Sequence, residues 1–187
     1  MKYFRSILSV VALMSLSTVV FAQSDAQKAP SGSQKAFDKL KTLAGSWEGR
    51  VSTVPPQRGM GNGVMTDISL RITSRGNAMV HEMKEAGTAD DPARYDHPVT
   101  MFYLDGDRLL LTHYCDAGNR PRMSGKMSAD GKTVKFEFLD LSGGTPYGHM
   151  DHAVFAFVDA NHHIEEWTYM MPGDKPVRAR FDLQRTK

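Results

Sequence analysis

The stretch from Ser46 to Arg185 consists of short runs of alternating apolar and polar residues, and nearly every run ends at Gly, Pro, Asn or Asp. Alternation with a period of two places successive side chains on opposite faces of a β-strand. Connections this short join antiparallel strands, because parallel strands need crossovers of about a dozen residues or more. The sequence therefore predicts an all-β fold, an antiparallel up-and-down barrel of about ten strands.

Turn residues divide this region into individual strands. Two Asp-Gly pairs, at 105–106 and 130–131, are typical of tight hairpins. We expect the first of these hairpins to place Phe102 opposite Leu109. The predicted strands cover 46–53, 65–73, 78–85, 99–104, 108–115, 122–128, 133–140, 149–158, 163–171 and 177–185.

A short amphipathic helix is expected before the first strand. Phe37, Leu40 and Leu43 recur three residues apart on one helical face, and Gly45 ends the segment. Residues 23–34 are mostly Ser, Gly, Pro, Gln, Lys and Ala, a composition that buries too little apolar surface to order itself. We therefore expect a flexible tether over 23–34 and one folded domain, the helix and barrel, over 35–187.

The first 22 residues have the pattern of a secretory signal peptide. Lys2 and Arg5 form a basic start, an apolar segment interrupted by serines follows, and the small residue Ala22 stands at the expected cleavage position. A membrane-spanning helix would need roughly 18 or more unbroken apolar residues. We therefore expect an exported protein, periplasmic or extracellular, with no membrane span in the mature chain.

Charge and cysteine content limit the classes of partner. The formal net charge of +2 falls to zero once Lys2 and Arg5 leave with the signal. A neutral chain has no charge excess to attract nucleic acid or an anionic membrane, so neither is expected as a partner. Cys115 is the only cysteine and forms no disulfide within the chain. Stability must then come from burial and from the hydrogen bonds of the sheet.

The segment Leu43-Ala44-Gly45-Ser46-Trp47-Glu48-Gly49 resembles the Gly-x-Trp opening of the calycin superfamily, which includes lipocalins, fatty-acid-binding proteins and nitrobindin-like haem-binding barrels. The resemblance implies that Trp47 closes one end of the barrel beneath an arginine of the last strand, Arg185 or Arg180. The run from Leu109 to Met123 also resembles a segment of secreted bacterial proteins of unassigned function, so the likeness brings no activity with it.

His113 and Cys115 are the most unusual polar residues of the strand region. They are two residues apart and share one strand face with Leu109 and Leu111. If this face is internal, an imidazole and a thiol lie in an apolar pocket. The opposite face, which carries Tyr114, is also apolar, so the pattern alone does not choose between them. The alternative is a core histidine bonded to a backbone carbonyl.

Asn119 and Arg122 follow this strand after a Gly-containing turn. An arginine fork beside an asparagine is suited to a ligand carboxylate, because it donates two parallel hydrogen bonds. The alternative is an exposed charge in a loop. The complete set of expected ligand-binding residues is His113, Cys115, Asn119, Arg122, Phe102, Leu111, Met83, His152 and Trp167.

The remaining ionisable residues suggest no metal site. His149 and His152 are three apart, so on a regular strand only one of them faces the lumen. The pair His162-His163 is expected in a solvated turn, and the pair Glu165-Glu166 is expected on the surface. In the pair at 81–82 one residue points inward, and the pattern does not indicate which. A structural zinc site needs four convergent ligands. No cofactor is expected, and haem bound by one lumenal histidine is the alternative that the nitrobindin-like resemblance implies.

Three functions from different classes remain open. The first is a binding protein that holds a small, largely apolar or amphipathic ligand in its lumen. The second is an enzyme that uses His113 as general base or as haem ligand, although the sequence contains no Gly-x-Ser-x-Gly nucleophile motif. The third is a barrel filled with side chains that acts through its outer surface. The oligomeric state is not indicated by the sequence.

Overall fold

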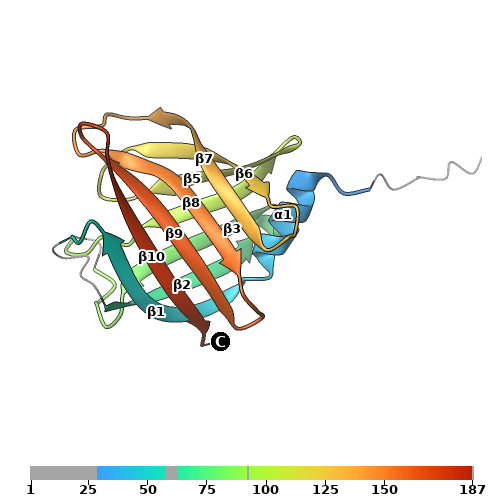
Figure 1. Cartoon of the computed structure of the whole chain (residues 1–187), viewed down its shortest axis with the longest axis horizontal. Helices are drawn as coiled ribbons and strands as arrows, with labels where there is room; N and C mark the ends of the chain where they lie inside the picture. Colours follow the sequence, from blue (N-terminus) through green and yellow to red (C-terminus); the bar gives the residue numbers. More distant parts are fainter. Residues whose placement is uncertain (1–28, 58–62, 92, 187) are drawn as a thin grey trace, which may run out of the picture.

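Ten antiparallel strands close into one barrel, in which each strand pairs with its neighbours in sequence and the first pairs with the last (Figure 1). The computed structural model describes residues 29–57, 63–91 and 93–186. The predicted signal peptide over 1–22 and the first half of the predicted tether, 23–28, lie outside the described residues. Within the described part of the chain, the predicted all-β barrel with a short N-terminal helix is confirmed.

All ten predicted strands are present, with boundaries within two residues of those expected. They are β1 (Gly45–Val54), β2 (Val64–Thr73), β3 (Ala78–Glu85), β4 (Val99–Asp105), β5 (Arg108–Tyr114), β6 (Arg120–Met127), β7 (Thr133–Ser142), β8 (His149–Phe157), β9 (His162–Met171) and β10 (Lys175–Arg185). Most strands alternate between buried and exposed residues, as β1 and β10 do throughout.

The register of the β4–β5 hairpin differs from the expected one. Phe102 lies opposite Leu111, not Leu109. The reason is that Asp105 still pairs with Arg108, so the turn is centred on Gly106 and its neighbour Asp107. Gly106 has a φ of 59°, the left-handed region in which glycine is favoured. A register shift of two residues keeps every side chain on its expected face.

Helix α1 (Gly32–Lys41) covers one end of the barrel (Figure 1). It begins before the expected boundary, because the Ser31 side chain caps the helix by accepting a hydrogen bond from the backbone N–H of Gln34. Residues 32–34, expected in the tether, are therefore helical. Ser33 Oγ donates to the carbonyl of Asp107 at 2.7 Å, which ties α1 to the β4–β5 turn. Within the described ranges, no helix is long and apolar enough to cross a membrane.

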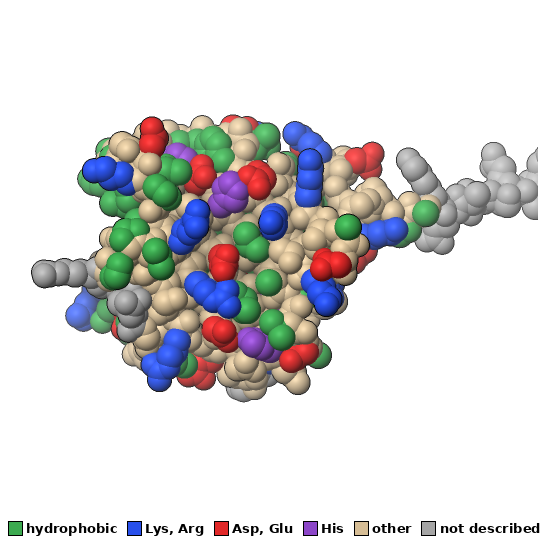
Figure 2. All heavy atoms as spheres, in the orientation of Figure 1, with side chains coloured by type: hydrophobic (Ala, Val, Ile, Leu, Met, Phe, Trp, Pro, Cys, Tyr) green, Lys and Arg blue, Asp and Glu red, His purple; other side chains and the backbone are tan. Residues whose placement is uncertain are grey.

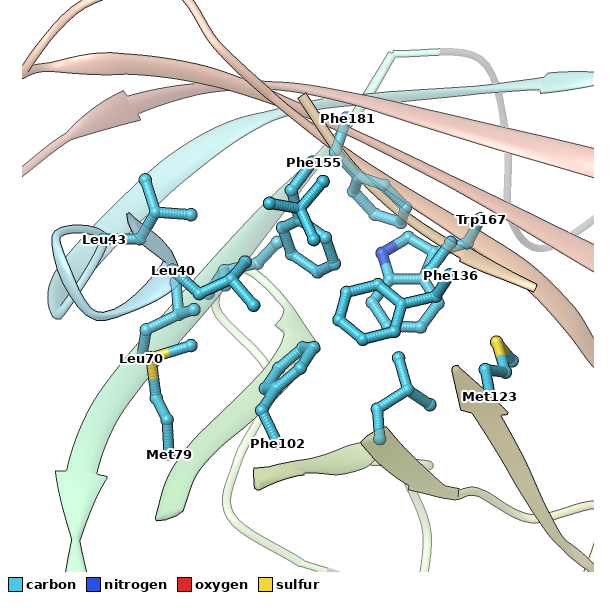
Figure 3. Close-up of a cluster of buried hydrophobic side chains, with 14 of the residues drawn as sticks. Leu40, Leu43, Leu70, Met79, Phe102, Met123, Phe136, Phe155, Trp167 and Phe181 are labelled. Atoms are coloured by element: carbon cyan, nitrogen blue, oxygen red, sulfur yellow. The ribbon is translucent and has the colours of Figure 1, made fainter. Parts of the chain in front are cut away.

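Aromatic side chains fill the half of the barrel nearest α1. The rings of Phe102, Phe136 and Phe155 lie 5.4–6.0 Å apart between centroids, in tilted and edge-to-face arrangements (Figure 3). Leu40 of α1 packs against the same cluster. This half of the barrel is therefore a packed core.

The outer surface carries charges of both signs. On the face shown in Figure 2, blue and red side chains are interspersed over the strands and do not separate into regions of one sign. Two surface ion pairs link neighbouring strands: Arg180 of β10 pairs with Glu166 of β9, and Arg122 of β6 pairs with Asp140 of β7.

Candidate ligand-binding site

A cavity of about 500 Å³ lies at the barrel end opposite α1. Its walls come from the last residues of β1, β3, β5 and β9 and from the first residues of β2, β8 and β10. Loop residues 94–96, 98 and 116 reach its mouth. The apolar part of the lining is made by Val51, Val64, Met83, Pro98, Met150, Trp167, Met171, Val177, Ala179 and Phe181.

His113 contributes an unpaired nitrogen to this cavity. The side chain points inward with only 1% of its surface exposed, which places the β5 face that carries it inside the barrel. Its Nδ1 is 2.8 Å from Oγ1 of Thr100, and its buried Nε2 has no hydrogen-bond partner. Burial, with a smaller contribution from the charge of His81, lowers the pKa of His113 from 6.5 to about 3. The imidazole is therefore neutral at physiological pH.

This shift makes stability depend on pH. The unfolded chain binds a proton at His113 below about pH 6.5, whereas the folded chain does so only near pH 3. The contribution of His113 is complete above pH 6.5 and is lost as pH falls toward 3. We expect His113→Phe to flatten the decline in unfolding free energy between about pH 7.5 and about pH 5, as measured by chemical denaturation. An equally steep decline in the variant would contradict this assignment.

Beneath the cavity lies a buried carboxylate, Glu165 of β9. Its Oε2 accepts a hydrogen bond from Nε1 of Trp167 at 2.9 Å and lies 2.9 Å from Nε2 of His81. Its Oε1 lies 3.0 Å from Nε2 of His163. All four side chains are buried. Burial by itself would raise the pKa of the Glu165 carboxyl, but the charge and hydrogen bonds of His81 and His163 outweigh it and hold that pKa below its usual value.

The sequence interpretation of Glu165 and His163 was wrong. Glu165 and His163 were expected at the surface and in a solvated turn, but both lie inside the barrel with 0% exposure. His81 is the inward-facing member of the 81–82 pair. One signal was available, because His163, Glu165 and Trp167 alternate on one strand face, and Trp167 was already expected inside.

The buried network continues to the closed end of the barrel. The ring of His163 meets Trp47 edge-on, with 4.1 Å between centroids. Trp47 donates from Nε1 to the carbonyl of Leu43 at 2.8 Å, and the guanidinium of Arg185 lies 4.1 Å above its ring. Arg185 also donates to the carbonyls of Thr42 and Ala44. Arg180, the other arginine considered, forms its ion pair on the outer surface instead.

Some predicted ligand-binding residues gather at the cavity and others do not. Met83, His113, Cys115 and Trp167 line it. Cys115 is a free, half-buried thiol whose pKa is raised by burial. Phe102 and Leu111 are fully buried in the aromatic core on the α1 side and do not reach the cavity.

Arg122, Asn119 and His152 are not positioned to meet a ligand in the lumen. Arg122 lies on the outer face of β6, because it pairs with Thr112 of β5, which also faces outward. It donates two hydrogen bonds to the Asp140 carboxylate there. Asn119 is buried but donates to the carbonyls of Gly144 and Gly148, so it anchors the 143–148 loop.

His152 is displaced from the lumen by a local irregularity of β8. The β8–β9 register shifts between Met150 and His152, which leaves Met150 at the cavity and His152 on the outer surface. There its imidazole pairs with Glu137 at 2.5 Å and with Asp151 at 3.1 Å. Of His113, Asn119 and Arg122, which were expected to meet an acidic ligand head group, only His113 lines the cavity.

A second hollow, of about 730 Å³, lies along β1, β2 and β3. Its lining includes four carboxylates and the ion pair of Lys84 with Asp90, in which the nitrogen and oxygen are 2.8 Å apart. Nε2 of His97, which lines this hollow, is also buried without a hydrogen-bond partner. The first cavity is the candidate ligand site because its lining is the more apolar of the two. In the described part of the chain, no three His, Cys, Asp or Glu side chains are grouped so as to hold a metal ion.

The fold and the site define a closed ten-stranded antiparallel β-barrel with an internal cavity at one end. No protein-family model matches the sequence, and no curated protein matches it. One solved structure with a similar fold is a protein of unknown function from the DUF3598 family of Nostoc punctiforme, with a TM-score of 0.42 and 8% sequence identity. The match covers 79% of this chain and 48% of that one, so this chain spans about half the length of that protein.

Proposed function

We propose that this protein binds a small, largely apolar molecule in the cavity at the open end of its barrel. The observation that carries the proposal is the Nε2 atom of His113, which is buried and unpaired and belongs to a residue that lines the cavity beside Val51, Trp167, Val177 and Phe181. Buried polar groups in folded proteins nearly always have a hydrogen-bond partner, so an unpaired one in a cavity indicates a missing partner. The cavity volume falls within the range of about 300–1,000 Å³ typical of small-molecule sites.

We also propose that the barrel is of the calycin type and that the protein is exported. The first proposal is supported by the Gly45-Ser46-Trp47 opening and by the position of Arg185 over the Trp47 ring. Such a contact stabilises a barrel by about 0.5–2 kcal/mol. The second is supported by the basic and apolar pattern of residues 1–22.

Haem is the alternative occupant that one specific observation favours. Axial ligation of iron requires a neutral imidazole whose Nε2 lone pair is free. His113 is neutral and its Nε2 is unpaired, so it would serve in the tautomer in which Nδ1 carries the proton and donates to Thr100. A general base would need the same tautomer, and a pKa of about 3 makes His113 a weak base. A barrel that acts only through its outer surface would leave this nitrogen without a role.

Purification of the full-length gene product from its expressing cells tests these alternatives together. Native mass spectrometry is expected to show a mature chain beginning at Gln23 with an additional small mass bound. A Soret absorption band would identify haem in place of an apolar ligand. The protein without any bound mass, and without affinity for an added probe, would favour the outer-surface function.

A cavity-filling variant then locates the site. We expect Ala179→Trp, which introduces an indole into the lumen, to weaken binding of the apolar dye N-phenylnaphthylamine by about tenfold or more. Ser52→Trp, on the exposed outer face of β1, is the matched control and should bind the dye as the wild type does. Equal dye affinity in both variants, with unchanged melting temperatures, would exclude the lumen as the binding site.

A further inference from the structure

We infer that the cavity selects uncharged ligands that present a hydrogen-bond acceptor, such as a ketone or ester carbonyl, to Nε2 of His113. This inference rests on the proposed function and names the class of ligand that the site takes. It follows from three observations: the partner of the other imidazole nitrogen, the absence of charge in the deep lining, and the way in which Trp167 is already bonded.

The partner of Nδ1 determines which nitrogen carries the proton. Thr100 Oγ1 is 2.8 Å from Nδ1, and Thr100 is fully buried without lining the cavity. If Nδ1 donated to Thr100, the hydroxyl hydrogen would need a second acceptor in the core. If the hydroxyl donates to Nδ1, it is satisfied, and the proton lies on Nε2. The second arrangement leaves one unpaired donor, and that donor belongs to a residue that lines the cavity.

Nε2–H therefore needs an acceptor, and a ligand in the cavity can supply it. Trp167 is not an equivalent donor, because its Nε1–H is already bonded to Glu165 at 2.9 Å. Because this N–H is already bonded, the Trp167 indole offers a ligand only apolar contacts. An unpaired buried donor is unfavourable, and a ligand acceptor would relieve this.

The deep lining contains no charge to balance an ionised ligand. The buried residues that line the cavity besides His113 are Val51, Thr66, Trp167, Val177 and Phe181. None of the charged lining residues is buried: Glu85, Arg94, Asp96 and Asp116 are exposed, and Lys84 is half-buried and paired with Asp90. The neutral state of His113, a consequence of its lowered pKa, adds no positive charge. A buried carboxylate would lose its hydration without gaining a counter-ion.

Three naphthalene derivatives substituted at the same ring position separate these requirements. Acetylnaphthalene carries a carbonyl acceptor, ethylnaphthalene carries none, and naphthoate carries a charge. Each is titrated against the wild-type protein loaded with N-phenylnaphthylamine, whose fluorescence reports displacement from the cavity. We expect naphthoate to compete about tenfold or more weakly than acetylnaphthalene. Equal competition by naphthoate would overturn the selection of uncharged ligands.

The contribution of His113 is measured as the affinity ratio of acetylnaphthalene to ethylnaphthalene. His113→Phe is expected to lower this ratio by about 3- to 10-fold, and His113→Gln, which restores an N–H donor, to recover part of it. Thr100→Val should also lower the ratio, and it replaces His113→Phe if that variant does not fold. His152→Phe, on the outer surface, is the matched control.

The two proposals fail in different ways. An unchanged ratio in a folded His113→Phe variant that still binds the dye would overturn the ligand class but leave lumenal binding intact. Wild-type protein that binds neither the dye nor any of the three competitors would overturn lumenal binding itself.

Discussion

Replacing Glu165 with leucine is expected to lower the free energy of unfolding by about 3–5 kcal/mol. The carboxylate is the common acceptor for Trp167, His81 and His163, and all of these groups are buried. Leucine leaves three buried nitrogens without an acceptor, and each unsatisfied donor is unfavourable by about 1–3 kcal/mol. Chemical denaturation followed by tryptophan fluorescence measures the loss.

The adjacent residue provides a matched control. Glu166 follows Glu165 on β9 but faces outward, where it forms an exposed ion pair with Arg180. Glu166→Leu should change the unfolding free energy by at most about 1 kcal/mol, the upper end for exposed pairs. Similar losses in the two variants would show that the buried network does not have the stabilising role assigned to it.

Gly49→Ala is expected to destabilise the barrel by about 3 kcal/mol or more. A Cβ atom at Gly49 would lie 1.9 Å from the backbone oxygen of Asp182 and 2.7 Å from its carbonyl carbon. A backbone neighbour cannot rotate away as a side chain can, so β1 and β10 would have to separate where they close the barrel. The melting temperature and the soluble yield of the variant test this prediction.

Gly32→Ala is the control for this substitution. A Cβ at Gly32 would meet no atom within 4 Å, and the position begins a helix, in which alanine is favoured over glycine. We expect a melting temperature equal to or slightly above that of the wild type. If Gly49→Ala were as stable as Gly32→Ala, the close approach of β1 to β10 would not be a constraint on the sequence.

The barrel was predictable from the sequence because each strand carries its own evidence. Alternation and turn residues are local signals, and they located all ten strands within two residues. The register of the β4–β5 hairpin was harder to predict, because an Asp-Gly pair can occupy more than one position in a turn. The prediction paired Phe102 with Leu109, two residues from its actual partner Leu111. The start of α1 was predicted too late, because the polar composition of residues 23–34 favoured a tether and gave no weight to Ser31 as the helix cap.

The candidate site was only partly predictable, because its decisive contacts join distant residues. His113, Cys115, Met83 and Trp167 were expected at the cavity and line it. Glu165 was assigned to the surface because carboxylates are rarely buried unless they are paired. Its partner His81 is 84 positions away in the sequence, and no local pattern indicates a pairing across the barrel.

The closure of β1 against β10 has a consequence for how this chain acquires its structure. Arg185 reaches back 141 residues to the carbonyl of Ala44, so the first strand obtains its second neighbour only from the end of the chain. Until β10 arrives, the sheet has two unpaired edges that can pair with other chains. Folding is therefore expected to be slow for a domain of this size and sensitive to loss of C-terminal residues during synthesis.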